Sequence, residues 1–338
     1  MFFAVLKRGA LLSAMALVST VLVACSGGNV LPPPGPRPQA IAYTAIGASD
    51  AVGYGASVPC DTTIPPQVAT PTCPGGTGYV PDIAKSLASS GKTVVTLNDL
   101  GITGDVIAPD IAALVNQYSS AGLAPCQPRT GGAVVGNFIT DELPKLTGNE
   151  TLVTIFAGGN DTNGIVNAAI CQVQLGILPA ASLPTFLAAQ IQAFGVDFVG
   201  LVQSIRAKAP NAKIVVANLP NFAGIPFAKV LPPGVQMLLQ TVSVGIDTTV
   251  YQPAATQSRL PVVDLLCDPS SYVPTNFFVD GFHPNDAGYA AVAGLFVAQI
   301  SAAIPALPQT SCVQMKLVST AFRPLGLGIP AFDRPKLR

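Results

Sequence analysis

The chain has a single histidine, His283, in 338 residues, and its surroundings predict proton-transfer chemistry. Histidine has an ordinary pKa near neutrality, so it can accept and return a proton at physiological pH. Asp280 lies three residues earlier and can hold one ring nitrogen while the other faces a reacting group. The same spacing also fits a structural histidine at a helix start or in a core. The catalytic interpretation therefore requires a nucleophile and oxyanion donors elsewhere in the chain.

Ser49 is the candidate nucleophile. It follows the apolar run 40–46, which has the length and flanks of a buried strand, and Gly53 and Gly55 come shortly after it. A residue just past the carboxyl end of a strand lies where open α/β sheets place their chemistry. The alternative role for Ser49 is to cap a helix N-terminus. The two roles are compatible, because the N–H groups at a helix start can also stabilise a developing negative charge.

Two further turns contain candidate oxyanion donors. Gly104 follows the predicted strand 93–97, and glycine there permits a positive φ or a close backbone approach, or simply a turn. Asn160 follows two glycines at the end of the predicted strand 151–157. Its amide can donate to a developing oxyanion, although asparagine after glycine is also a common turn residue.

The elements that must position these residues alternate along the chain. Apolar, β-branched runs predict strands at 40–46, 93–97, 151–157, 213–217 and 261–266. Helical spacing of apolar residues predicts helices at 79–89, 110–118, 183–209, 235–251 and 286–304. We expect a loop containing Cys171 before the helix 183–209. The pattern predicts an α/β fold, a three-layer α/β/α sandwich around a five-stranded, mainly parallel sheet.

The N-terminus reads as a targeting segment. Lys7 and Arg8 precede the short apolar run 10–23, which ends at Cys25 in the sequence Leu-Val-Ala-Cys. This ending resembles the lipobox of bacterial lipoproteins, in which the cysteine is lipidated and becomes the first mature residue; the alternative is an ordinary signal peptide cut near Ala24. We predict a signal peptide over 1–24 and a Pro/Gly-rich tether over 25–39.

Six cysteines remain after Cys25, and an even number in an exported chain favours disulfides. Proximity along the chain suggests three pairs: Cys60–Cys73, Cys126–Cys171 and Cys267–Cys312. The cysteines lack the close spacing of a zinc site, and one histidine cannot complete such a site. We predict one catalytic domain over 40–308, with a C-terminal extension, 309–338, partly docked through Cys312.

The charge pattern argues against a nucleic-acid-binding protein. Lysine plus arginine equals aspartate plus glutamate, charged residues make up 10% of the chain, and 49% of residues are apolar. No run of basic residues forms the footprint that nucleic acid requires. The composition defines no oligomeric state, but it is sufficient for a large buried core.

The four polar turns together resemble the signature blocks of the SGNH or GDSL-type serine hydrolases. In order they are Gly47-Ala48-Ser49-Asp50, Thr103-Gly104, Gly158-Gly159-Asn160-Asp161 and Asp280-Gly281-Phe282-His283-Pro284. The first block departs from the family pattern, which usually has aspartate where this chain has Ala48. The resemblance implies Ser49 as nucleophile, His283 as general base and Asp280 as its orienting acid. It also implies an oxyanion hole formed by the N–H groups of Ser49 and Gly104 with the Asn160 side chain, and no metal or organic cofactor.

These observations lead us to expect an exported serine esterase or lipase that hydrolyses carboxylic esters through an acyl-enzyme. We expect a cell-envelope lipoprotein, at the outer membrane or cell surface, held to the membrane through Cys25. One alternative is a carbohydrate O-acetyl esterase on the same fold. A chain with no tryptophan and 7 tyrosines gives little support to a carbohydrate site and favours an acyl or lipid ester. Another alternative is a non-catalytic surface lipoprotein that binds a ligand.

Overall fold

The computed structural model describes residues 39–61, 68–89, 93–118 and 135–319. The predicted signal peptide, Cys25, the tether up to residue 38 and Cys126 lie outside these residues, as does the chain after residue 319. The described residues belong to one compact unit, Pro38–Arg338.

Five parallel strands form the central sheet, in the order β2-β1-β3-β4-β5. Their bounds are β1 Gln39–Gly47, β2 Thr93–Asp99, β3 Leu152–Phe156, β4 Lys213–Ala217 and β5 Val262–Val263. The first four lie within two residues of the predicted runs, whereas β5 is shorter than the predicted 261–266, since only two residues pair with β4. This strand order is the flavodoxin-like doubly wound topology, and it confirms the predicted fold class.

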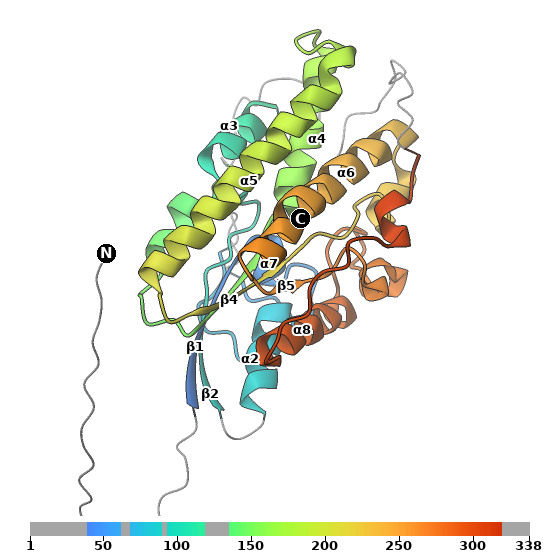
Figure 1. The fold of residues 1–338 in the computed structure, drawn as a ribbon. Helices are drawn as coiled ribbons and strands as arrows, with labels where there is room; N and C mark the ends of the chain where they lie inside the picture. Colours follow the sequence, from blue (N-terminus) through green and yellow to red (C-terminus); the bar gives the residue numbers. More distant parts are fainter. Residues whose placement is uncertain (1–38, 62–67, 90–92, 119–134, 320–338) are drawn as a thin grey trace, which may run out of the picture. The chain divides into compact units, whose positions relative to one another are not determined.

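Helices cover both faces of the sheet (Figure 1). The longer helices are α2 Tyr79–Ala88, α3 Pro109–Tyr118, α4 Gly159–Gln174, α5 Leu183–Lys208, α6 Pro233–Ile246 and α8 Asp286–Ser301; the short ones are α1 Ser49–Val52 and α7 Gln252–Gln257. In Figure 1, α2 and α8 lie on one side of the strands, and α3, α4, α5 and α6 lie on the other. The layers therefore match the predicted three-layer sandwich.

Alternation along the strands builds a separate core on each face. In β4, Ile214 and Val216 join the core under α4, α5 and α6, whereas Val215 and Ala217 join the core under α2 and α8. Successive side chains of a strand point to opposite faces, and a strand covered on both faces is apolar throughout. This explains why the strands appear in the sequence as continuous apolar runs.

Two predicted elements differ from the structure. Cys171 lies in α4, a 16-residue helix, and not in a loop. The prediction of a loop was wrong because the first half of α4 contains polar and small residues and obscures the helical period. The second element, predicted as a helix over 235–251, is α6 followed by a π-helical turn, η5 Asp247–Tyr251, and then α7.

One described helix, Ala180–Lys208, is apolar and long enough to cross a membrane by length and composition alone. Its α5 portion buries Leu187, Phe194, Phe198 and Leu201 in the core. Burial of that face is what a long core helix requires.

Candidate active site

The carboxyl ends of the central strands lie level with one another. The predicted site residues that follow these strands therefore lie at the same edge of the sheet. Gly47 at the end of β1 pairs with Phe156 at the end of β3, and Phe156 pairs with Ala217 of β4. The strand order reverses between β1 and β3, since the chain leaves β1 toward β2 on one side and β3 lies on the other. Such a switch point opens a crevice beyond the strand ends. Ser49 follows β1 there, and Asn160 follows β3.

Ser49 is the first residue of α1, two residues after β1 ends. The turn is tight: a Cβ on Gly47 would lie 3.0 Å from the Ala51 Cβ and 3.3 Å from the Phe156 carbonyl oxygen. Gly53 ends α1 in the left-handed conformation, with φ of 77°. Because the first N–H groups of a helix lack intrahelical acceptors, the Ser49 backbone N–H is available for an oxyanion.

Ser49, His283 and Asp280 form one hydrogen-bonded line. The Ser49 Oγ lies 2.9 Å from His283 Nε2, and His283 Nδ1 lies 2.6 Å from Asp280 Oδ2. An ionised carboxylate can accept but not donate, so the Nδ1–H of His283 donates to Asp280 and Nε2 is left as the acceptor for the serine hydroxyl. The structure thus brings Ser49 next to His283, 234 positions further along the chain, and the three groups stand in the order that general-base activation of a hydroxyl requires.

The local chain around Asp280 orients its carboxylate. Gly281 adopts a φ of 67°, and the resulting turn lets Asp280 Oδ1 accept from the backbone N–H groups of Phe282 and His283 at 2.9 and 3.0 Å. Burial raises the pKa of Asp280. The hydrogen bonds and charge of His283, together with the two backbone N–H groups, lower this pKa by more than burial raises it, so the net pKa is below its usual value. Asp280 is therefore held as the anion.

Two rings confine the His283 imidazole. The Tyr54 ring lies 4.6 Å from it, centroid to centroid, and the Phe282 ring lies 4.9 Å away, both in edge-on geometry. Tyr54 is itself held in place, since Tyr289 donates a 2.7 Å hydrogen bond to its carbonyl. The imidazole is thus oriented by packing as well as by Asp280.

Asn160 and Gly104 are linked through Asp105. One N–H of the Asn160 side-chain amide donates to the Asp105 backbone carbonyl at 2.9 Å. The second N–H takes part in no hydrogen bond with a described residue. Gly104 has a φ of 89° and open space where a Cβ would lie, and no described residue accepts from its N–H. The structure thus places the predicted donors Gly104 and Asn160 in adjoining turns. Each has an N–H group that no described residue accepts from.

The sequence matches a known family over most of its length. A profile of the GDSL-like lipase/acylhydrolase family matches residues 45–291. The chain belongs to this family. It is accordingly an ester-hydrolysing enzyme with the fold described above.

Solved structures with a similar fold include lipases and esterases. They include the lipase Lip_vut3 from a goat rumen metagenome, at 18% identity and a TM-score of 0.46, covering 76% of this chain and 96% of that one. Phospholipase A1 from Streptomyces albidoflavus is 17% identical with a TM-score of 0.45, covering 77% and 99%. A family 2 carbohydrate esterase from Corynascus thermopiles is 18% identical with a TM-score of 0.41, covering 80% and 68%. A comparison with curated protein sequences found no significant match.

Buried carboxyl groups support the turns around Ser49, Gly104 and Asn160 in this GDSL-like hydrolase, and sequence reasoning missed these contacts. Glu142, in the π-helical turn η1 Phe138–Glu142, is fully buried and accepts from the Gly47 N–H at 3.0 Å. Asp161 accepts from the Ile107 N–H at 2.9 Å, and Asp99 accepts from the Gly101 N–H at 3.0 Å. Glu142 and Asp161 bind backbone from distant parts of the chain, so no local motif reveals their partners, whereas Asp99 binds the N–H of a residue two positions along the chain.

Burial changes the charge state of these acids. It raises the pKa of Asp99 to about 8 and that of Asp161 to about 7. It raises the pKa of Asp105 to about 7, with the nearby Asp141 adding to the effect, and that of Glu142 well above its usual range. Desolvation disfavours the anion of a buried carboxyl. At mildly acidic pH these acids are therefore mainly neutral, whereas Asp280 is ionised.

Ala48 stands where the family usually has an aspartate. Ala48 is buried in the core on the α4 and α5 side, where a carboxylate would carry a desolvation cost. Glu142, which binds the Gly47 N–H, puts a carboxyl group beside the same turn. The departure from the family pattern thus leaves Ser49 and its hydrogen bond to His283 in place.

Both described disulfides confirm predicted pairs. Cys60 pairs with Cys73, and Cys267 pairs with Cys312. The second bond joins Cys312, near the start of the C-terminal extension, to Cys267. Cys171 is disulfide-bonded, but Cys126 lies outside the described residues, so the pairing between them stays a prediction.

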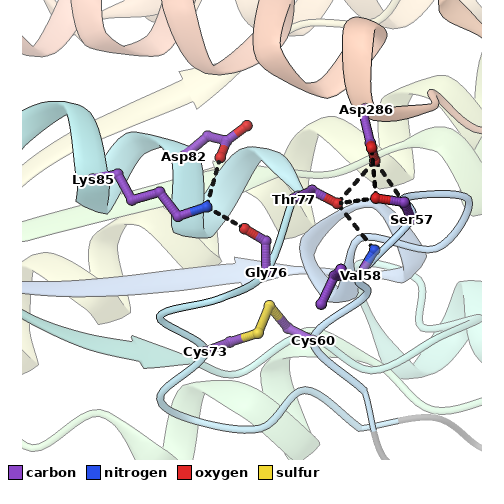
Figure 2. Close-up of polar contacts among 9 residues, drawn as sticks. All are labelled: Ser57, Val58, Cys60, Cys73, Gly76, Thr77, Asp82, Lys85 and Asp286. Atoms are coloured by element: carbon purple, nitrogen blue, oxygen red, sulfur yellow. Dashed lines mark hydrogen bonds and ion pairs between the residues drawn. A yellow bond between two sulfur atoms is a disulfide. The ribbon is translucent and has the colours of Figure 1, made fainter.

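The segment before the first disulfide packs against the His283 loop. Figure 2 shows hydrogen bonds converging on Asp286, the first residue of α8: Ser57 donates through its N–H at 2.7 Å and its hydroxyl at 2.6 Å, and the Thr77 hydroxyl donates at 2.8 Å. These bonds lower the pKa of Asp286 although its partial burial raises it. The start of α8, three residues after His283, is thereby tied to the chain on both sides of the Cys60–Cys73 disulfide.

An apolar pocket, partly open to solvent, lies beside the hydrogen-bonded line of Ser49, His283 and Asp280, since Asp50, Phe282 and Pro284 are among its lining residues. Its walls include Phe156, Phe222, Phe282 and Leu219, and Asp50 is the only charged residue among the described residues that line it. Burial raises the pKa of Asp50; the nearby His283 opposes this effect and Asp280 adds to it. Among the described residues, no three His, Cys, Asp or Glu side chains are grouped to hold a metal ion.

Proposed function

We propose that this GDSL-like hydrolase is a serine esterase with Ser49 as nucleophile, His283 as general base and Asp280 as the orienting acid. The observation that carries the assignment is the line from Ser49 Oγ to His283 Nε2 at 2.9 Å and from His283 Nδ1 to Asp280 Oδ2 at 2.6 Å. Positioned general-base help of this kind typically contributes ~10²–10⁴-fold to rate.

The reaction proceeds in two balanced steps. His283 Nε2 takes the Ser49 hydroxyl proton as Oγ bonds to the ester carbonyl carbon. The carbonyl oxygen becomes an oxyanion, which the N–H groups of Ser49 and Gly104 and the Asn160 amide stabilise. The bond to the alcohol oxygen then breaks, and His283 returns its proton to the leaving alcohol. Water, activated by the same nitrogen, attacks the acyl-enzyme, releases the carboxylic acid and restores the Ser49 hydroxyl.

The proposed substrate is an acyl or lipid ester. The pocket beside the catalytic line supports this choice, because its walls are mainly aromatic and aliphatic. Apolar walls favour burial of hydrocarbon at roughly 25 cal/mol per Å² removed from water. Asp50 stands in this wall, so we expect a negatively charged acyl group to be bound poorly.

A panel of esters tests the assignment. The purified protein is incubated with short- and long-chain p-nitrophenyl esters and with acetylated xylan, beside the Ser49→Ala variant. We expect turnover of the p-nitrophenyl esters, little release of acetate from xylan, and background rates for Ser49→Ala. Preferred turnover of xylan would reassign the enzyme to carbohydrate O-acetyl esters. A fluorophosphonate should label wild type and spare Ser49→Ala; labelling of neither would leave a non-catalytic binding protein.

We further propose that the protein is exported and lipidated at Cys25, in the cell envelope. The support is the lipobox-like sequence ending at Cys25 together with the disulfides Cys60–Cys73 and Cys267–Cys312, which form and persist in oxidising compartments. Metabolic labelling with a fatty-acid analogue should mark the wild-type protein and not Cys25→Ser. Equal labelling of both would remove Cys25 as the modified residue.

A further inference from the structure

Two segments beside the active site pack against one another. They are 221–231, which contains the short 3-10 helix η4 Pro226–Val230, and 269–284, which ends in the His283 loop. The Phe227 N–H donates to the Gly281 carbonyl at 2.9 Å, and the Phe227 and Phe282 rings lie 5.5 Å apart, centroid to centroid. The two segments therefore form one continuous surface.

A third segment, 313–319, joins this surface. The Asn221 side-chain amide donates to the Gln314 carbonyl at 2.7 Å, and a Cβ on Gly224 would lie 2.5 Å from the Leu317 side chain. We call the three segments 221–231, 269–284 and 313–319 the rim.

The rim borders the catalytic line directly. The N–H of Phe278, in the rim, donates to the His283 carbonyl at 2.8 Å. The Phe278 ring lies 6.0 Å from that of Tyr54, which in turn lies 4.6 Å from the imidazole. A substrate reaching Ser49 therefore passes close to rim side chains.

Large apolar side chains of the rim are exposed to solvent. Val279 is 93% exposed and Val230 is 87% exposed, and each lies within three residues of the hydrogen bond that joins their segments. Val313 and Leu317 are also exposed. A cluster of exposed apolar residues around a site marks a surface that binds something apolar, because leaving it in water is unfavourable.

The exposed charged side chains of the rim have one sign. Lys229 and Lys316 are its only basic residues other than His283, and both are exposed. Its only acid is Asp280, whose side chain is 4% exposed and bound to His283. Exposed apolar side chains beside cations, with no exposed acid, complement a surface of hydrocarbon covered by anionic groups.

We propose that the rim docks on a bilayer containing anionic lipid, with Val230 and Val279 entering the interface and Lys229 and Lys316 facing lipid phosphates. This inference rests on the proposed esterase function in one respect: docking would deliver lipid-embedded esters to Ser49. Each lysine near an anionic surface contributes roughly fivefold to binding.

The outer side of α5 is the competing surface. Val196 is 68% exposed there and lines, with Val199, an apolar groove between α5 and the turn η5. No charged residue lines this groove, and it has no part in the catalytic line. It therefore provides a matched control of similar exposure and residue type.

Single-tryptophan reporters test the docking, because the chain contains no tryptophan. Val230→Trp, Val279→Trp and Val196→Trp are each made in the full chain with Cys25→Ser, so that no lipid is attached. Fluorescence is recorded with vesicles of phosphatidylcholine and of phosphatidylcholine mixed with phosphatidylglycerol, with and without brominated acyl chains. We expect a blue shift and quenching for the two rim reporters on mixed vesicles, and neither for Val196→Trp.

The controls separate the possible outcomes. Adding Lys229→Gln and Lys316→Gln to Val230→Trp should raise the lipid needed for half-maximal shift, by roughly fivefold for each lysine. No shift at either rim position, or an equal shift at Val196→Trp, would overturn the proposal. Turnover of dissolved p-nitrophenyl acetate is measured on the same samples. Its absence in the wild-type chain would count against the esterase assignment and leave the docking result unaffected.

Discussion

The Asn160 side-chain amide donates a 2.9 Å hydrogen bond to the backbone carbonyl of Asp105, the residue that follows Gly104. Two donors proposed for the oxyanion are thus fixed relative to one another, although they come from turns 56 residues apart in the chain. Donors that are already held in place need no reorganisation during the reaction, which is the main source of their effect on rate.

Asn160→Ala should therefore lower kcat by about 10²–10³-fold, with a much smaller change in KM, because the oxyanion develops only in the transition state. Steady-state kinetics on a soluble p-nitrophenyl ester provide the measurement. Asn163→Ala, one turn further along α4, serves as the control. Near-normal turnover by Asn160→Ala would remove this residue from the oxyanion hole.

Asp280→Asn should lower kcat by on the order of 10³–10⁴-fold while leaving fluorophosphonate access to the site. The amide cannot act as the anion that orients the imidazole. Since the hydrogen bonds of His283 lower the pKa of Asp280, its stabilising contribution is present above its unfolded pKa and lost as pH falls through the lower folded value. Wild-type stability should consequently fall below about pH 4, and urea titrations of both proteins should converge there. Curves that stay equally far apart at acid pH would contradict this account.

Glu142→Gln and Glu142→Ala should differ in stability. Glutamine keeps an acceptor for the Gly47 N–H and matches the neutral carboxyl that burial favours, so we expect a loss of less than about 1 kcal/mol. Alanine leaves that buried N–H without an acceptor, at a cost of about 1–3 kcal/mol, and leaves a cavity besides. Urea unfolding at neutral pH measures both variants. Equal losses would show that the hydrogen bond to Gly47 is unimportant.

The raised pKa of Asp99 predicts how stability changes between pH 5 and 8. Its folded pKa is about 8, so in this range the folded state holds a proton that the unfolded state has released. Stability should then fall as pH rises, by up to ~1.4 kcal/mol per pH unit for this group; Asp105 and Asp161, with pKa values of about 7, act in the same direction. Thermal unfolding across this range should show a weaker pH dependence for Asp99→Asn than for wild type. An unchanged slope would mean that Asp99 ionises freely in the folded protein.

The Cys60–Cys73 disulfide closes a short loop, with a sequence separation of 13. Replacing both cysteines by alanine should cost about 3 kcal/mol, from the chain entropy regained on unfolding. Because Asp286 ties both sides of this loop to the start of α8, we also expect kcat to fall in the double variant. Cys267→Ala with Cys312→Ala provides the comparison, since that bond holds the C-terminal extension and not the start of α8. A kcat loss as large in this comparison pair would argue against a specific link to His283.

The sequence by itself determined the strands, the fold class and the residues that we propose for catalysis. Strands such as β4 are buried on both faces, so they remain apolar throughout and are visible as runs. Ser49 and Asn160 stand just beyond strand ends, and His283 stands just before a helix. Each lies in a short segment of polar residues and glycine that can be recognised from the neighbouring sequence alone.

Tertiary structure alone decided which distant groups support those turns. Glu142 reaches the Gly47 N–H across 95 positions, and Asp161 reaches the Ile107 N–H across 54. Such contacts depend on which distant segments the fold brings together. A single acidic residue in the sequence does not reveal its partner. Burial, which sets the charge state of these acids, is likewise a property of the folded chain, as is the exposure of Val230 and Val279 beside the catalytic line.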